Sequence, residues 1–503
     1  MDTRTRQRRA GAVLLLLTLA SLLGRLATAP DYVQDHDGFY FSRAVERYSV
    51  AEMRPHWPGY PVYVWGGKAL RLVTGDARRA LRLLSILASA ASLWPIALLA
   101  SAWRRALGGT PDESERAGLA AALVWMLAPL PWFVGTELLS DGPGLLLALG
   151  TLLFSWYAVE EPEGHALVAA SATAGLLLGT RLAYVSLLLP LGYAAWQARN
   201  RPRHLGAAAG ALAVPVGAWF GWQLAMDGTR LFDIARGHLG RHLIFPATTV
   251  ASDAHPWERA VAVWKTTTVY GVGGWWPSTD GGRWPATLVL GGLIVAGGLR
   301  LRRVTASSAA RLPWLWAGPY ALGLVLAFDS VHFPRYVLPL VALASLVAGL
   351  GLPERRMGAT LTLAAVACSM AVVSIPLAVA HGKVGPVEWQ FARYVVARFD
   401  AARTAILVNV HDAPMLTLFL AAEVPTVALS PADPDGETAR RFEALGHKAL
   451  STSPPVAAPG EWTPIARFCR GREVDPRGPF DLWLFRHDRG GSTFAALPAC
   501  FSP

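Results

Sequence analysis

Two carboxylates, Asp35 and Asp37, lie one residue apart in the stretch DYVQDHDGFYFSRAVERY, residues 31–48. The stretch follows directly on the first long apolar segment, at the predicted surface of a membrane. A carboxylate is costly to keep at a bilayer boundary, which indicates a functional task. Near lipid its pKa can rise until it acts as a general base. The pair could instead hold Mg²⁺ or Mn²⁺ through oxygen ligands, and both roles stay open.

Further polar groups stand at predicted boundaries of apolar segments. They are Glu137 with Asp141, Arg181, and His332 with Arg335 and Tyr336. Taken singly, each has a plain alternative, such as a solvated carboxylate, a turn or an interfacial anchor. The predicted topology, however, places all of them on the same side of the membrane as the first carboxylates. Arginines there could hold a phosphate by bidentate hydrogen bonds, while the acidic residues would complete a polar cavity.

The composition is that of a membrane protein. Of 503 residues, 53% are hydrophobic and 16% are charged, against about 25% charged in soluble proteins. Long apolar runs recur from residue 11 to about 380 and then stop, which predicts a membrane domain followed by a soluble domain. The net charge of +11 comes almost wholly from arginines clustered between apolar runs. This pattern follows the positive-inside rule and argues against nucleic-acid binding.

The first apolar run, residues 10–29, follows a basic N-terminus. It could be a secretory signal peptide ending at Ala27-Thr28-Ala29, but its length and the many later spans favour an uncleaved anchor. We therefore expect a cytoplasmic N-terminus, with Arg25 reaching the headgroups. Ten further spans are predicted at 80–102, 117–134, 143–159, 165–180, 182–198, 205–226, 284–300, 312–328, 336–353 and 358–380.

The run 165–198 decides the topology, since it is either one long helix or a hairpin that turns at Arg181. A hairpin makes the loops 199–204, 300–311 and 354–357 cytoplasmic, and these hold three, four and two arginines. The opposing loop 329–335 holds only one arginine, Arg335. The positive-inside rule thus favours the hairpin, about eleven spans and an external C-terminus.

Two long outer loops follow from this topology, residues 30–79 and 227–283. The segment 56–73 of the first is rich in Trp, Tyr and Pro, which suits a segment on the membrane interface, although it could be a plain connector. In the second, His238 and His242 are four residues apart and would share one face of a helix. Two histidines without a third ligand are more typical of interfacial or solvated side chains than of a metal site.

The C-terminal segment from 381 to 503 has the pattern of a small α/β domain. We expect helices at 387–400, 413–422 and 435–445 and strands at 404–410, 425–429, 463–468 and 481–486. It has no glycine-rich phosphate loop or nucleophile elbow, so we interpret it as an external accessory or acceptor-recognition domain. Cys469 and Cys500 could form a disulfide there, whereas Cys368 is expected to be a small core residue.

The stretch DHDGFYFSRAVERY resembles the first outer loop of the GT-C superfamily of integral-membrane glycosyltransferases. It resembles especially the bacterial relatives of protein O-mannosyltransferases and of the aminoarabinose transferases that modify lipid A. Asp37 matches the leading acidic position, with Tyr40 and Ala44 behind it. Gly38 stands where the family often has Glu, which leaves open whether Asp35 or Asp37 is the working carboxylate.

Four more stretches, in the order of the family, extend the resemblance over about residues 10–380. They are HWPGYPVYVW (56–65), ELLSDGPGLLLALG (137–150), GLLLGTRLAYVSLLLPL (175–191) and HFPRYVLPL (332–340). The resemblance implies a polytopic α-helical catalytic domain over 1–380. It further implies inverting sugar transfer at the external membrane face, from a polyprenyl-phosphate-linked donor to a lipid, glycan or protein acceptor.

These expectations assign roles to the residues singled out above. Asp37 would be the general base, with Asp35 assisting it or sharing a metal ion. The substrate-binding residues would be Tyr40, Glu137, Asp141, Arg181, His332, Arg335 and Tyr336. The main alternative is a transporter or flippase for lipid-linked sugars, which should carry ionisable residues near mid-span or helices broken in corresponding halves. A non-catalytic membrane scaffold is the other alternative.

Overall fold

The computed structural model consists of two compact units. The first is formed by Met1–Ala29 and Tyr40–Val379, and the second by Pro30–Phe39 and Ala380–Pro503. The structure describes residues 3–161, 164–244, 255–273, 284–302, 307–328, 333–409, 416, 426–429, 437–452, 462–469, 481–487 and 499.

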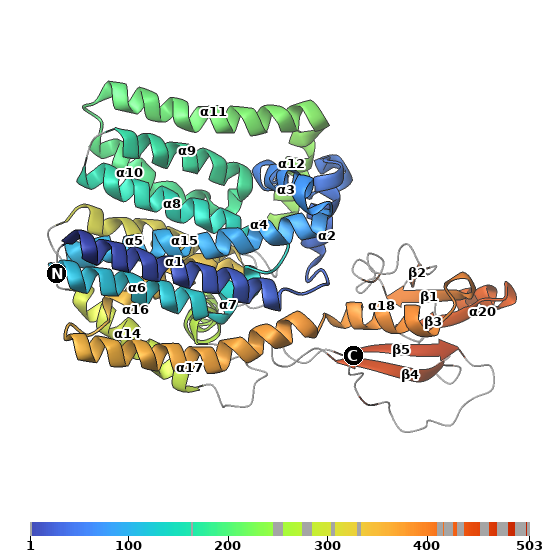
Figure 1. Ribbon diagram of the computed structural model, residues 1–503. Helices are drawn as coiled ribbons and strands as arrows, with labels where there is room; N and C mark the ends of the chain where they lie inside the picture. Colours follow the sequence, from blue (N-terminus) through green and yellow to red (C-terminus); the bar gives the residue numbers. More distant parts are fainter. Residues whose placement is uncertain are drawn as a thin grey trace. The chain divides into compact units, whose positions relative to one another are not determined.

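The first unit is a bundle of helices (Figure 1). Those up to residue 197 are α1 (Thr3–Thr28), α2 (His36–Glu46), η1 (Val50–Glu52), α3 (Pro61–Thr74), α4 (Ala77–Ala91), α5 (Leu93–Ala106), α6 (Pro111–Leu127), α7 (Pro129–Val134), α8 (Asp141–Glu160), α9 (His165–Thr180), η2 (Leu182–Leu188) and α10 (Leu189–Gln197). The later ones are α11 (Pro202–Asp227), α12 (Arg230–Ile244), α13 (Pro256–Trp264), η4 (Lys265–Val272), α14 (Trp284–Leu301), η5 (Ala309–Arg311), α15 (Leu312–Ala327), η6 (Pro334–Val337), α16 (Leu338–Leu350) and α17 (Arg356–Lys383).

Five of the described helical segments are long and apolar enough to cross a bilayer. They are Arg8–Thr28 of α1, Ala77–Ala106 with the consecutive helices α4 and α5, α8, α11, and Arg356–Arg398, which begins with α17. Helices α8, α9 and α11 lie side by side, as do α5, α6 and α16 (Figure 1). Large side chains fill the space between helices, among them the fully buried Trp103, Trp125, Trp156 and Trp316. The predicted multi-span membrane protein is thus confirmed as a fold.

The run 165–198 is interrupted at the predicted turn, because α9 ends at Thr180 and Arg181 has an extended backbone with φ −156° and ψ 91°. Two predicted spans are less regular than expected. The span 117–134 is divided into α6 and α7 at Ala128, which is extended because it precedes Pro129. The span 182–198 starts as the 3₁₀ helix η2 before it becomes α10.

Two single-residue expectations about the bundle are wrong. Arg25 does not reach the headgroups, because its side chain is fully buried. Its guanidinium lies 5.1 Å from the centre of the Trp132 ring, and its Nη2 donates to the Pro131 carbonyl at 3.5 Å. The Trp132 ring and the Pro131 carbonyl of α7 therefore take the place of water around this cation. Cys368 is exposed and not a core residue, because the face of α17 that carries it is not covered by the rest of the unit.

The first outer loop is tied to the C-terminal end of α11. Gln223 Nε2 donates to the Tyr48 hydroxyl at 2.8 Å and to the Pro58 carbonyl at 2.7 Å. The Asp227 carboxylate accepts the main-chain N–H of Val50 at 2.8 Å and the hydroxyl of Ser49 at 2.7 Å. Burial raises the pKa of the Tyr48 phenol, so the ring keeps its proton. The part of the loop from 48 to 58 is therefore fixed to the first unit.

The predicted loop segments 56–73 and 227–283 both contain helices. In α3, Tyr63 and Val64 are buried whereas Leu72 and Val73 are exposed, an arrangement that suits a helix at the membrane interface. In the second loop, the His238 ring on α12 lies 5.5 Å from the Trp57 ring. The side chain of His242 lies outside the described residues.

The second unit contains a five-stranded mixed sheet with strand order β2-β1-β3-β5-β4. Its strands are β1 (Thr404–Asn409), β2 (Thr426–Leu429), β3 (Lys448–Ser451), β4 (Trp462–Cys469) and β5 (Asp481–His487), and its helices include α18 (Val387–Arg398), η7 (Ala401–Arg403) and α20 (Glu437–Ala444). Strand β1 pairs in parallel with β2 and β3, whereas β5 is antiparallel to β3 and β4.

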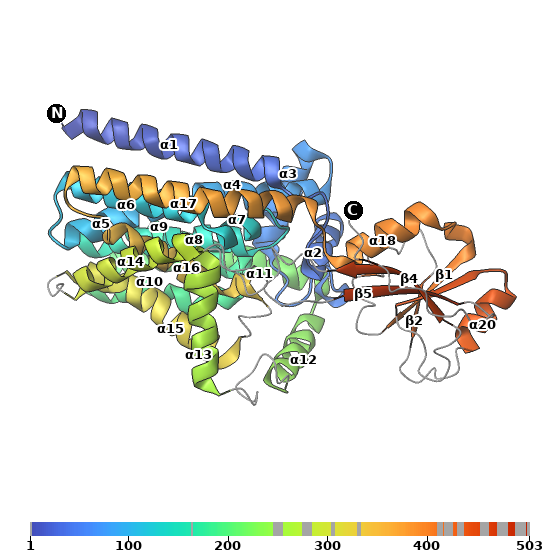
Figure 2. The ribbon, with the colours of Figure 1, turned by 90° about the horizontal axis from the view of Figure 1, so that it is seen from below.

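Side-chain alternation along the sheet explains how its two faces are covered. Ile406 of β1 packs with Phe391 of α18, while the next residue, Leu407, packs with Ala439 of α20. The two helices therefore cover opposite faces of the sheet (Figure 2). The helices and strands predicted within described residues are present, but β3 was not expected, because its four residues are too short for a clear pattern. The predicted helix 413–422 lies outside the described residues, apart from Leu416.

Of the cysteines expected to pair, Cys469 is disulfide-bonded, and Cys500 lies outside the described residues.

We predict that Gly59→Ala lowers the melting temperature of the detergent-solubilised protein more than Gly75→Ala. Both glycines have positive φ, +91° and +71°, so alanine costs about 1 kcal/mol or more at either. At Gly59 a Cβ would also lie 2.2 Å from Gln223 Nε2 and 2.3 Å from the Tyr48 hydroxyl, whereas at Gly75 it would meet nothing within 4 Å. Equal losses in the two variants would show that the attachment of the loop to α11 adds no stability.

Candidate functional site

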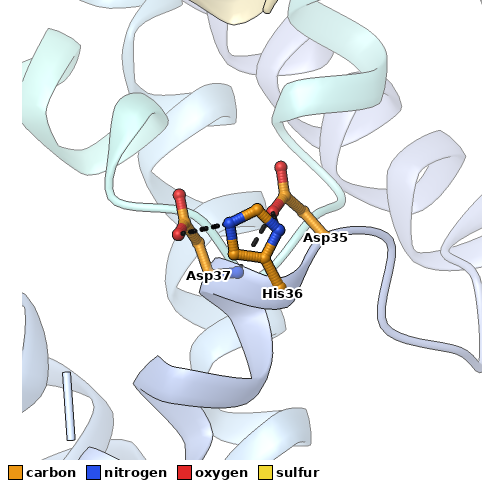
Figure 3. Close-up of side chains that lie close together, drawn as sticks. All are labelled: Asp35, His36 and Asp37. Atoms are coloured by element: carbon orange, nitrogen blue, oxygen red, sulfur yellow. Dashed lines mark hydrogen bonds and ion pairs between the residues drawn. The ribbon is translucent and has the colours of Figure 1, made fainter. Parts of the chain in front are cut away.

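The carboxylates predicted to do chemistry lie at the start of α2, in the second unit (Figure 3). His36 Nδ1 lies 3.0 Å from Asp35 Oδ1, and His36 Nε2 lies 3.6 Å from Asp37 Oδ1. The side chains of the two aspartates are 17% exposed and that of His36 is 46% exposed. Because a neutral imidazole donates from one nitrogen alone, only a protonated His36 could donate to both carboxylates.

Asp35 also has a structural task at this helix terminus. Its Oδ1 accepts the main-chain N–H of Asp37 at 3.1 Å, and its carbonyl accepts the N–H of Gly38 at 3.0 Å. A carboxylate that accepts an N–H of the first turn caps a helix and is stabilised by the helix dipole. Asp35 therefore accepts a main-chain hydrogen bond from the helix terminus through its side chain. The spacing of the two aspartates in the sequence does not show that Asp35 has this task.

A buried ion pair lies in the first unit, between the start of α8 and the end of α9. Arg181 Nη2 lies 2.8 Å from Asp141 Oδ1, and Arg181 Nη1 donates to the Ser140 hydroxyl at 3.0 Å. The Asp141 side chain is 0% exposed and that of Arg181 is 7% exposed. Charges buried this deeply are tolerated only when they are paired and hydrogen-bonded, which explains why the chain breaks its helices here.

Aromatic rings connect this ion pair to the late Arg-Tyr motif. The Arg181 guanidinium lies 5.2 Å from the centre of the Tyr184 ring and 5.8 Å from that of Tyr336. The Arg335 guanidinium lies 5.6 Å from the same Tyr336 ring. These are cation–π distances. The Tyr320 hydroxyl donates to the main-chain carbonyl of Tyr336 at 2.7 Å, which holds the backbone of the residue whose ring both cations share.

Within the described residues, the structure therefore gathers the predicted site residues in two places. Asp141, Arg181, Arg335 and Tyr336 come together in the first unit, and Asp35 and Asp37 in the second. Tyr40 on α2 lies with its ring 6.3 Å from that of His56, and Glu137 is half-buried in the segment between α7 and α8. His332 lies outside the described residues.

Several residues of these clusters were not predicted. Ser140, Tyr184 and Tyr320 surround the buried arginine, and His56 Nε2 lies 3.0 Å from the Tyr60 hydroxyl in the first outer loop. Ser140 and Tyr184 could have been found, because polar residues next to a charge in an apolar segment commonly hydrogen-bond or stack with it. Tyr320 carries no such signal, since it lies within the long apolar run of α15.

The donor types at the start of α2 fit a divalent metal ion. Asp35, His36 and Asp37 offer one ligand atom each, all within 4.8 Å of one another. Carboxylate oxygens are ligands for Mg²⁺ and Mn²⁺, while imidazole nitrogen suits softer ions such as Zn²⁺. The histidine between the two carboxylates thus makes Mn²⁺ a better fit than Mg²⁺, and it adds Zn²⁺ to the ions predicted from the carboxylates alone.

Residues 55–219, about a third of the chain, match the family model described as dolichyl-phosphate-mannose-protein mannosyltransferase. ArnT from Cupriavidus metallidurans bound to undecaprenyl phosphate has a similar structure, with a TM-score of 0.55 at 13% identity over 96% of this chain and 98% of that one. The same protein in its apo state gives 0.54 at 14% identity, over 95% and 98%. The predicted relationship to the GT-C glycosyltransferases is confirmed.

The family match and the shared fold agree with the predicted enzyme class, a glycosyltransferase that depends on a polyprenyl-phosphate sugar. The archaeal oligosaccharyltransferase AglB from Archaeoglobus fulgidus, in complex with an inhibitory peptide and a dolichol-phosphate, is less similar. Its TM-score is 0.48 at 11% identity, over 89% of this chain and 70% of that one. A second structure of the A. fulgidus oligosaccharyltransferase is in complex with Zn and sulfate. No curated protein matches this chain in sequence.

We predict that Arg181→Gln destabilises the protein by about 3–5 kcal/mol, because it leaves the Asp141 carboxylate buried without its cation. The double variant Arg181→Gln/Asp141→Asn should be more stable than Arg181→Gln alone, since no charge is then left buried. Thermal unfolding in detergent measures both, with the exposed Arg199→Gln as the control. A double variant no more stable than Arg181→Gln alone would refute the ion pair as the reason for the loss.

Proposed function

We propose that this protein transfers a sugar from a polyprenyl-phosphate-linked donor to a hydroxyl acceptor at the external face of the membrane, with inversion at the anomeric carbon. The observation that carries this proposal is the family match over residues 55–219, which lies within the same helical unit as the Asp141–Arg181 pair. The ArnT structure, with undecaprenyl phosphate bound, supports the same donor class through its fold. The acceptor would be a lipid, a glycan or a protein.

In the proposed reaction, Asp37 takes the proton from the acceptor hydroxyl as its oxygen attacks the anomeric carbon. The new glycosidic bond forms while the bond from that carbon to the phosphate oxygen breaks, and the polyprenyl phosphate leaves with the electron pair. Attack opposite the leaving group inverts the configuration. Asp37 is preferred as the base because Asp35 is engaged in capping α2. His36, next to both carboxylates, would orient them.

We further propose that Arg335 contacts the donor phosphate and that Arg181 acts mainly by organising the surroundings. Both guanidinium Nη atoms of Arg181 already contact Ser140 and Asp141, and its side chain is nearly fully buried. Arg335 is half-buried and stacks on the same tyrosine ring. The charges of Arg181 and Asp141 cancel. In this proposal the positive charge that attracts the donor phosphate is therefore that of Arg335.

For the topology we propose about eleven spans, a cytoplasmic N-terminus and an external C-terminal α/β unit. The support is the arginine content of the loops 199–204, 300–311 and 354–357, together with the chain break at Arg181. A metal ion at Asp35, His36 and Asp37 is an alternative use of the same carboxylates. When bound, such an ion would act as a Lewis acid toward phosphate.

We expect Asp37→Asn to reduce sugar transfer by about 10²–10⁴-fold, because an amide cannot accept the acceptor proton. Asp35→Ala should lose less activity and more thermal stability, since alanine has no side-chain oxygen to cap α2 as Asp35 does. The assay follows radiolabel from a panel of polyprenyl-phosphate sugars into membrane lipid extract, glycans and protein. The exposed Asp233→Asn is the control.

Undiminished transfer by Asp37→Asn would remove this residue from the base role. Absence of transfer from every donor, with labelled lipid moving between leaflets of proteoliposomes instead, would favour a flippase.

Chelation separates a base from a metal ligand at the same carboxylates. If Asp37 is the base and no ion takes part, treatment with EDTA should leave the transfer rate unchanged. A rate that falls with EDTA and returns with Mn²⁺ or Zn²⁺, but not in Asp35→Asn, would instead assign these side chains to a metal site.

A further inference from the structure

A cavity of about 700 Å³ lies in the first unit, where α14 ends and α17 begins. It is separate from the residues discussed above, since its lining comes from the end of α14, the connection between α16 and α17, and the first turns of α17. These are the connections that the positive-inside rule assigns to the cytoplasmic side.

The cavity opens on an apolar surface. Leu299, Met357 and Leu361 belong to its lining and are 53%, 78% and 65% exposed. In a membrane protein, apolar side chains that stay exposed on spanning helices face acyl chains. A ligand that enters this cavity from the side therefore comes from the bilayer.

The polar wall of the cavity carries an excess of positive charge. Arg300 and Arg355 line it together with one carboxylate, Glu354. Glu354 Oε1 lies 3.8 Å from Arg300 Nη2 and 3.1 Å from Nη2 of Arg104, a residue outside the lining. The carboxylate is thus shared between two guanidinium groups. Arg300 is fixed in place, because its Nη1 donates to the Leu352 carbonyl at 2.6 Å.

We infer that this cavity binds an anionic phospholipid of the surrounding bilayer. The phosphate would lie beside Arg300 and Arg355, and an acyl chain would follow Leu299, Met357 and Leu361. Basic pockets between membrane helices recognise anionic headgroups in this way. A soluble anion would leave the apolar side of the cavity uncovered, whereas a phospholipid matches both walls. The inference does not depend on the proposed sugar transfer.

Native mass spectrometry of the full-length protein in detergent tests this inference, with phosphatidylglycerol and phosphatidylcholine of the same acyl chains as probes. We expect selective retention of phosphatidylglycerol and a loss of about fivefold in its affinity in Arg355→Gln. Ala296→Leu, which fills the apolar part of the lining and keeps every charge, should weaken binding as well. Undecaprenyl phosphate serves as a third probe.

The matched control is Arg199→Gln/Arg203→Gln, which removes two exposed arginines outside the cavity. Phosphatidylglycerol binding should be unchanged in this control, and melting temperatures identify any variant that fails to fold. Three results would each overturn the inference. These are equal retention of the two phospholipids, equal weakening in the control and in Arg355→Gln, and retention of undecaprenyl phosphate in preference to phosphatidylglycerol.

Discussion

The first unit depends on one buried interaction, the ion pair between Asp141 and Arg181. Neither charge could be kept in a membrane-embedded bundle alone, so the start of α8 and the break after α9 must meet. The Arg181 guanidinium then makes cation–π contacts with the rings of Tyr184 and Tyr336. The Tyr336 ring makes a second such contact, with Arg335. Residues from three distant parts of the sequence are thereby held around one pair of charges.

A similar principle holds the first outer loop. Two polar side chains at the end of α11 bind the loop. Gln223 donates hydrogen bonds to the Tyr48 hydroxyl and the Pro58 carbonyl, and Asp227 accepts one from the main-chain N–H of Val50. The close approach at this point requires Gly59 with its positive φ. Backbone groups that lie between helices need such partners, because neither lipid nor an apolar core can satisfy them. The side chains of this part of the loop, from Tyr48 to Gly59, are therefore presented by a fixed backbone.

The start of α2 shows how local structure can give two neighbouring carboxylates different tasks. Asp35 accepts an N–H of the first turn, and a helix start needs such an acceptor whatever the chemistry nearby. Asp37, two residues on, lies within the turn that this cap stabilises. The division supports a catalytic role for Asp37, and the position of His36 between them explains why a metal ion is the competing use of the same groups.

Much of this molecule follows from the sequence by itself. Apolar runs determine the membrane helices, arginines between them predict the hairpin at Arg181, and strands that alternate with helices predict the α/β character of the second unit. The short motifs around Asp37, Asp141 and Arg335 also suffice for the enzyme class. Only the tertiary structure decided that Arg25 is buried against Trp132, that Arg181 is paired with Asp141, and that Tyr320 hydrogen-bonds the backbone of Tyr336. The physical reason is that a charged residue in an apolar run shows, from the local sequence, that burial of the charge costs free energy. The partner that offsets this cost lies on a distant helix, so the local sequence does not identify it.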